Sequence, residues 1–228
     1  MTRKELIGLI ENGETLICEY KLHFSSHEKM AKEIIAFANT SGGTLIIGVD
    51  DDRRIIGVES EKTETELILE TLNNYCVPKI EVKFQYFEIE DPRQTDKSKE
   101  IVVVSVPESK NKPHRIQDYN EELDIRTARV YVRINDKSVP ASKEMIRVLR
   151  SCSSGTSLKK YSIGNIEKLI FKFLEKNETI SVKTLAQFAN ISQRRASRSL
   201  VNLVRADLLL IHTNGSTDDY FTGRRSET

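Results

Sequence analysis

The sequence predicts an α+β protein that is divided into two domains of opposite charge. Helical and strand-like segments alternate through residues 1–150, whereas residues 159–228 are mostly helical and end in two short strands. Residues 1–150 hold 23 Lys and Arg against 27 Asp and Glu, and residues 151–228 hold 12 against 7, which gives net charges of −4 and +5. The small polar residues of 151–158 are typical of a linker. We therefore expect two domains, of which the basic second one contacts phosphate.

The composition predicts a cytoplasmic protein without a membrane partner. The three cysteines are scattered and form no CxxC pair, so neither a disulfide framework nor a cysteine-based zinc site is indicated. The longest apolar runs, TLIIGV and IVVVSV, have the length of strands and are too short to cross a bilayer. The first residues predict an amphipathic helix rather than a signal peptide.

The opening segment predicts a helix followed by a buried strand. Thr2 and Glu5 have the spacing of a capping box, and Asn12-Gly13 ends the helix. GETLICEYK, from Gly13 to Lys21, carries apolar residues on both faces, which is typical of a buried strand. Its Glu19 shares a face with Lys21, so one interpretation of these charges is a half-buried ion pair.

The remaining elements of the first domain follow from caps and periodicity. Ser25 and Glu28 predict the start of a second helix, which ends at Asn39–Gly43. TLIIGV and RIIGV predict a hairpin around Asp50–Arg53. Further predicted elements are a helix from Thr63 to Asn74, capped by Thr63 and Glu66, strands within Glu81–Glu90, Glu100–Val106 and Arg129–Ile134, and a helix from about Ser142 to Arg150.

The glycines of TSGGT do not predict a nucleotide site. Glycines that cradle phosphate precede a helix, whereas these follow one and serve as its C-terminal cap. The sequence also lacks the GK[ST] of a phosphate loop. We therefore expect no nucleotide cofactor.

Three acidic residues allow a second interpretation of the first domain. A strand–helix–strand order would place the first two strands parallel and bring Asp51, after the second strand, near Glu14 and Glu19. Convergent carboxylates suit Mg²⁺ or Mn²⁺, which activates water and neutralises a phosphodiester, with Lys21 assisting on the phosphate. The alternative is a solvated acidic turn, separate from the Glu19–Lys21 ion pair.

Several motifs resemble the AlbA-like domain of the Schlafen family. They are GETLICEYK, IIAFANTSGGTLIIGVDDD, VVVSVP and ARVYVRINDKSVPAS, in this order over roughly residues 5–150. The resemblance implies a three-carboxylate catalytic and metal site at Glu14, Glu19 and Asp51, with Lys21 as the lysine of the E-x-K pair. It also implies a metal-dependent endoribonuclease that acts on structured RNA such as tRNA. Many bacterial relatives that look similar at these residues are described only as nucleic-acid-binding proteins or regulators.

The sequence departs from the eukaryotic Schlafen nucleases in two respects. Those proteins join two AlbA-like lobes in one chain and hold a zinc ion, whereas this chain has one lobe and no matching Cys/His cluster. We therefore expect no zinc, and we expect a homodimer that supplies the second lobe.

The second domain has the pattern of a winged helix-turn-helix. NIEKLIFKFLEK predicts a first helix, Ser181 and Ser192 cap two more, and LLLIHT and DDYF predict a hairpin wing with its turn at Asn214-Gly215. In this fold the N-terminal residues of the third helix enter a major groove. These candidate nucleic-acid-binding residues are Gln193, Arg194, Arg195 and Arg198, and a weaker basic patch is Lys110, Lys112 and Arg115. The alternative for the helix is a solvated face that contacts protein.

Two functions therefore remain open at the level of the sequence. One is the metal-dependent endoribonuclease, in which the winged helix holds the RNA substrate. The other is a non-catalytic DNA-binding transcriptional regulator whose AlbA-like domain dimerises or senses a ligand. The acidic first domain favours the former, and the arginines of the third helix favour the latter.

Overall fold

The computed structural model describes residues 1–91, 94–117, 128–153, 162–213 and 218–224. Contacts between Cα atoms divide the chain into unit 1, Met1–Pro140, and unit 2, Ala141–Thr228. We predicted the boundary at residues 151–158, of which 154–158 lie outside the described residues. Helix α4 (Lys143–Ser153) packs against α7 (Gln193–Arg205) and is therefore part of unit 2. With this boundary, unit 2 holds 15 Lys and Arg against 8 Asp and Glu, a net charge of +7.

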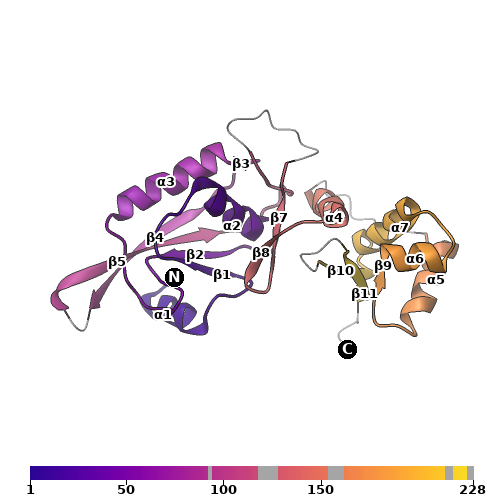
Figure 1. Cartoon of the computed structure of the whole chain (residues 1–228), viewed down its shortest axis with the longest axis horizontal. Coiled ribbons are helices and arrows are strands. Elements are labelled where there is room, and N and C mark those ends of the chain that lie inside the picture. The colour runs from indigo at the N-terminus through magenta and orange to yellow at the C-terminus, as the bar shows by residue number, and fades with distance from the viewer. Residues whose placement is uncertain (92–93, 118–127, 154–161, 214–217, 225–228) are drawn as a thin grey trace. The chain divides into compact units, whose positions relative to one another are not determined.

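The centre of unit 1 is a mixed four-stranded sheet (Figure 1). The strand order is β1 (Cys18–Lys21), β2 (Gly43–Ile47), β5 (Gln94–Val106) and β4 (Lys83–Asp91). The first two strands run parallel, as predicted, and the other pairs are antiparallel. The paired stretch of the two central strands, Gly43–Ile47 with Val102–Val106, is mostly apolar because helices cover both of its faces.

Helices cover both faces of this sheet (Figure 1). On one face lies α1 (Arg3–Asn12), whose Leu6 and Ile10 pack with Cys18 and Tyr20 of β1. On the other face lie α2 (His27–Asn39) and α3 (Glu61–Asn74), which share one apolar cluster with β2 and β5. Glu19 and Lys21 alternate with Cys18 and Tyr20 along β1, so their side chains point to the α2 face.

Two short strand pairs complete unit 1. They are β3 (Cys76–Val77) with β6 (Arg115–Ile116), and β7 (Tyr131–Ile134) with β8 (Lys137–Pro140). The buried Asn39 at the end of α2 joins both pairs. Its Nδ2 donates to the carbonyl oxygens of His114 (3.0 Å) and Tyr131 (2.9 Å), and its Oδ1 accepts from the His114 amide (2.8 Å). The asparagine of the NTSGG motif therefore has a structural role, because it connects the end of α2 to both strand pairs.

The two glycines after α2 allow a sharp entry into β2. Gly42 has φ 75°, which favours glycine, and its amide donates to the Phe37 carbonyl (2.9 Å). A Cβ atom on Gly43 would lie 2.2 Å from Cδ1 of Phe37. Gly42 therefore helps to end α2, as the sequence predicts, whereas Gly43 already belongs to β2 and allows its close packing against Phe37.

Some predicted boundaries in unit 1 were wrong. Strand β1 begins at Cys18, not Gly13, because Thr15 and Cys18 close a tight turn through their backbone groups. This turn leaves Leu16 and Ile17 exposed. The side chains that cap α2 and α3 belong to Ser26 and Ser60, rather than to the predicted Ser25 and Thr63.

The predicted hairpin between TLIIGV and RIIGV is reduced to its turn. An isolated antiparallel bridge joins Val49 and Ile55, and the Gly48 carbonyl accepts from the amides of Ile56 and Gly57. The long strand β5 occupies the edge of β2 instead, because its apolar residues from Val102 to Val106 pair along the whole of β2.

Unit 2 contains four helices and a three-stranded antiparallel sheet among its described residues. Besides α4 and α7, its elements are α5 (Asn165–Leu174), β9 (Ile180–Ser181), α6 (Val182–Phe188), β10 (Leu209–His212) and β11 (Tyr220–Gly223), with the strand order β10-β11-β9. Ser181 and Ser192 cap α6 and α7 as predicted. The predicted turn at Asn214-Gly215 lies outside the described residues. No helix in the described part of the chain is long and apolar enough to cross a membrane.

Candidate functional site

Glu19 of β1 is a buried carboxylate that has cationic partners on both oxygens. Only 6% of the surface of Glu19 is accessible to solvent. Oε2 accepts from Nη1 of Arg133 (2.7 Å), and Oε1 accepts from Nζ of Lys21. The predicted Glu19–Lys21 ion pair is therefore present, and a second, fully buried partner from β7 joins it.

Arg133 balances a second buried carboxylate as well. Its Nη1 also donates to Oε2 of Glu33 in α2 (3.0 Å), and its Nη2 donates to the carbonyl oxygen of Thr15 (2.6 Å). The guanidinium lies over the ring of Phe37, 4.7 Å from its centroid. Ser138 Oγ donates to the same Glu33 oxygen. We call Glu19, Glu33, Arg133 and Ser138 the buried charge network.

Glu33, Arg133 and Ser138 were not predicted from the sequence. The available signals were weak: Glu33 lies at helical spacing between Met30 and Phe37 on the apolar face of α2, and Arg133 is the only charge in the segment VYVRI. A charge on an otherwise buried face needs a partner, which is the argument that could have joined them.

Glu14 lies beside Glu19 at the start of the same segment. Its Oε1 accepts from the Tyr20 amide (3.2 Å), and the residue is exposed overall. Partial desolvation of the carboxyl raises the pKa of Glu14, and the negative charge of Glu19 raises it further. Two of the three predicted carboxylates are therefore close to each other.

The raised pKa of Glu14 predicts a small loss of stability as the pH rises. The folded state holds the Glu14 proton to higher pH than the unfolded state, so the ionised form is destabilising above the raised pKa. We expect Glu14→Gln to melt slightly higher than the wild type at neutral pH, and to match it below the ordinary glutamate pKa of about 4.3. Thermal melts over this pH range test the expectation, with the exposed Glu11→Gln as the control. A Glu14→Gln variant that melts lower at neutral pH would contradict it.

Asp51 is exposed and lies in the acidic turn after β2. It makes no hydrogen bond or ion pair with any residue that the structure describes. Its neighbours Asp50 and Asp52 both pair with Arg54, at 2.8 Å and 2.7 Å. Arg54 therefore pairs with two of the three aspartates of this turn and leaves Asp51 without a partner among the described residues.

These carboxylates do not fit a three-carboxylate metal centre as they are arranged. Both oxygens of Glu19 already accept from cationic side chains, and Asp51 contacts neither Glu14 nor Glu19. Within the described ranges, no group of three or more His, Cys, Asp or Glu side chains is placed to hold a metal ion. We therefore derive no catalytic step through a metal from this geometry.

The predicted basic patch on the loop after β5 is mostly buried. Lys112 pairs with Glu108 (2.6 Å) and donates to the Thr40 carbonyl (2.8 Å), and Arg115 is buried beside the Ala128 carbonyl. Only Lys110 is exposed. Lys112 and Arg115 are therefore structural residues and do not form a surface for phosphate.

The predicted basic face of α7 is fully exposed. Gln193, Arg194, Arg195 and Arg198 all lie at the surface, whereas Ala196, Leu200 and Leu203 of the same helix are buried. The three arginines make no hydrogen bond or ion pair with the described part of the chain. Their charges are therefore available to an external anion.

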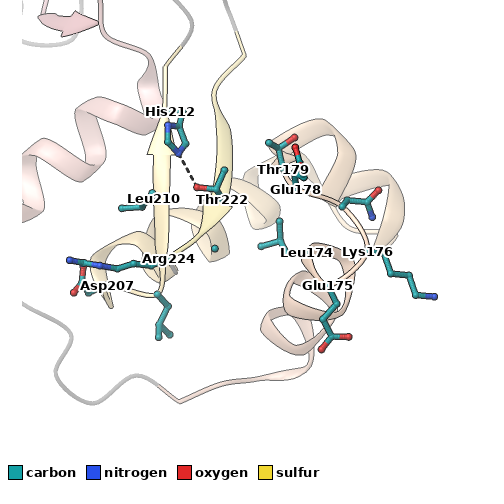
Figure 2. A pocket seen from close by; sticks show the side chains of 13 residues that line it. Leu174, Glu175, Lys176, Glu178, Thr179, Asp207, Leu210, His212, Thr222 and Arg224 are labelled. Carbon is teal, nitrogen blue, oxygen red and sulfur yellow. Dashed lines mark hydrogen bonds and ion pairs between the residues drawn. The ribbon is translucent and has the colours of Figure 1, made fainter. Parts of the chain in front are cut away.

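Unit 2 also has a wide groove beside its sheet (Figure 2). The groove is lined by the α5–β9 connection, the α7–β10 connection and parts of β10 and β11. Its charged residues have both signs: Glu175, Lys176, Glu178, Asp207 and Arg224. Asp207 and Arg224 pair with each other, and His212 Nε2 lies 2.9 Å from Thr222 Oγ1. This mixed lining is poorly suited to a phosphate backbone.

Comparison with known proteins identifies a family for most of unit 1. The family described as "Schlafen, AlbA_2" matches residues 14–142, which is more than half of the chain. The solved structure of the DIP2311 protein from Corynebacterium diphtheriae aligns with 90% of this chain at 17% identity and a TM-score of 0.43. The chain spans 41% of the length of that protein. No curated protein matches the chain significantly. The predicted homodimer stays a prediction.

Proposed function

Since the chain belongs to the Schlafen AlbA_2 family, we propose that it is a nucleic-acid-binding protein that holds its ligand through unit 2. The observation that carries the proposal is the exposed, unpaired arginine face of α7. The net charge of +7 of unit 2 adds a field that attracts polyanions.

The order of elements in unit 2 supports a winged helix-turn-helix. A turn joins α6 and α7, and the β10–β11 pair that follows α7 has the position of a wing. In this fold the second helix of the pair enters the major groove with its N-terminal residues in front. Duplex nucleic acid is therefore the ligand class that the arrangement fits, which favours the non-catalytic, DNA-binding regulator of the sequence analysis.

A triple variant of α7 tests the proposed function. Replacement of Arg194, Arg195 and Arg198 with alanine should weaken binding and lower the slope of log K against log [salt] by about 0.9 for each lost contact to a DNA phosphate. The fold should be retained because the replaced side chains are exposed. Filter binding to labelled duplex DNA, tRNA and single-stranded RNA over a range of salt concentrations measures both quantities.

The matched control removes the same charge elsewhere in unit 2. Lys168, Lys172 and Lys176 are exposed on α5 and the turn after it. Their replacement with alanine should change affinity and slope much less. Equal effects of the two triple variants, or a wild type without affinity for any of the three nucleic acids, would contradict the proposal.

A second candidate function is a metal-dependent endoribonuclease that uses Mg²⁺ or Mn²⁺. The proximity of Glu14 to Glu19 favours it, and a cation bound there would have to displace Lys21 or Arg133 from Glu19. The same labelled nucleic acids, incubated with Mn²⁺ or with EDTA, test this activity. Cleavage of tRNA in Mn²⁺ alone would support it.

A further inference from the structure

A cleft between α4 and α7 of unit 2 concentrates positive charge. Five of its eight lining residues are arginines: Arg147 and Arg150 from α4, and Arg194, Arg198 and Arg205 from α7. The other lining residues are uncharged. Only the α7 side was predicted from the sequence, because the segment of α4 was assigned to the first domain.

Polar contacts fix α4 against α7. Arg147 Nη1 donates to the buried Ser197 Oγ (2.5 Å), and this hydroxyl donates to Glu144 Oε1 (2.6 Å). Arg150 lies one turn further along α4 and is exposed. It makes no hydrogen bond or ion pair with the described residues. The position of Arg150 is therefore set by the helix, while its charge is left for an external partner.

The charge pattern of this cleft fits an extended polyanion. Like charges one helical turn apart, such as Arg194 and Arg198, repel each other unless an anion lies between them. The guanidinium group matches phosphate with two parallel hydrogen bonds. The arginines of α7 that line the cleft extend over 12 residues, or about 16 Å of helix, which is long enough to follow several phosphates of one strand.

We propose that the cleft between α4 and α7 binds the phosphate backbone of a nucleic-acid strand, so that α4 is part of the nucleic-acid interface. This inference rests on the proposed function and adds a second helix to it. In this arrangement Arg194 and Arg198 of α7 hold the backbone on one side of the cleft, and Arg150 of α4 holds a phosphate on the other side.

The charge-reversal variant Arg150→Glu tests the inference on the full chain. It should weaken binding to a short labelled duplex at least several-fold, and Arg150→Ala should lower the salt slope by about 0.9, the value for one phosphate contact. Both variants should remain folded, with only a small change in melting temperature, because Arg150 is exposed and unpaired in the described structure. The control is Lys172→Glu on α5, which changes the net charge equally outside the cleft.

The outcomes separate this inference from the proposed function. If Arg150→Glu and Lys172→Glu weaken binding equally, while the α7 triple variant still weakens it more than its lysine control, then α4 is not part of the interface and the proposed function stands. If the wild type does not bind nucleic acid, both the proposed function and the inference about the cleft are contradicted. Thermal melts with inorganic phosphate form a separate arm. A stabilisation that Arg150→Glu removes, together with unchanged nucleic-acid affinity, would assign the cleft to a small anion and overturn the inference.

Discussion

An Arg133→Met variant should lose about 3–5 kcal/mol of its free energy of unfolding, because it leaves two buried carboxylates without their shared cation. Glu19 would keep only Lys21, and Glu33 would keep Ser138 and a longer contact of 3.6 Å to Lys32. Methionine retains the length of the side chain and the packing on Phe37, so the loss reports mainly on charge. Chemical denaturation followed by circular dichroism measures it.

Two further variants isolate the electrostatic origin of this loss. Arg129→Met removes an exposed ion pair with Glu28 and should cost less than about 1 kcal/mol. Adding Glu33→Gln to Arg133→Met removes one of the two unpaired charges, so the double variant should be more stable than Arg133→Met alone. If Arg133→Met costs no more than the Arg129 control, the buried charge network does not stabilise unit 1.

The Glu19→Gln variant should be less stable than the wild type by about 1.5–3 kcal/mol, the range for hydrogen bonds to charged groups. The structural reason is that both oxygens of Glu19 accept from cations, one of which is buried. Glutamine keeps the shape but removes the charge that Arg133 and Lys21 face. Thermal melts with and without Mn²⁺ test this role, and the structure predicts no Mn²⁺ shift in either protein.

A metal centre at Glu14, Glu19 and Asp51 predicts the opposite result. Relief of repulsion would then leave the metal-free Glu19→Gln variant equally or more stable, and Mn²⁺ would raise the melting temperature of the wild type alone. Asp51→Asn serves as the second probe. It should leave stability unchanged because Asp51 is exposed, whereas a metal centre requires it to abolish the Mn²⁺ shift.

Local chemistry explains which parts of the fold the sequence predicts well. Helix caps act within a few residues, so their patterns can be recognised in the sequence. Examples are the serine caps of α6 and α7, the capping box of α1 and Gly42 after α2. The buried charge network is different. Arg133 lies 114 residues from Glu19 and 100 from Glu33, and no periodicity in a single segment connects them.

The position of α4 also depends on contacts between distant residues, which sequence patterns do not reveal. The small polar residues after Arg150 indicate a connection, but composition does not report which unit a helix packs against. Ser197, which is buried in α7, decides this through its contacts with Arg147 and Glu144. The candidate nucleic-acid interface therefore extends over a helix that the sequence pattern assigned to the other domain.

The long separations within the buried charge network have a consequence for synthesis of the protein on the ribosome. Glu19 and Glu33 leave the ribosome well before Arg133, since chains emerge from the N-terminus at a finite rate. During this interval Glu19 has only Lys21 and Glu33 has only Lys32 as a cationic neighbour, so we expect closure of the α2 face to wait for Arg133. The final strand pair, β7 and β8, then supplies Arg133 and Ser138 together. Strands β7 and β8 are synthesised last and complete unit 1. We expect their docking to be the slow step in the folding of unit 1.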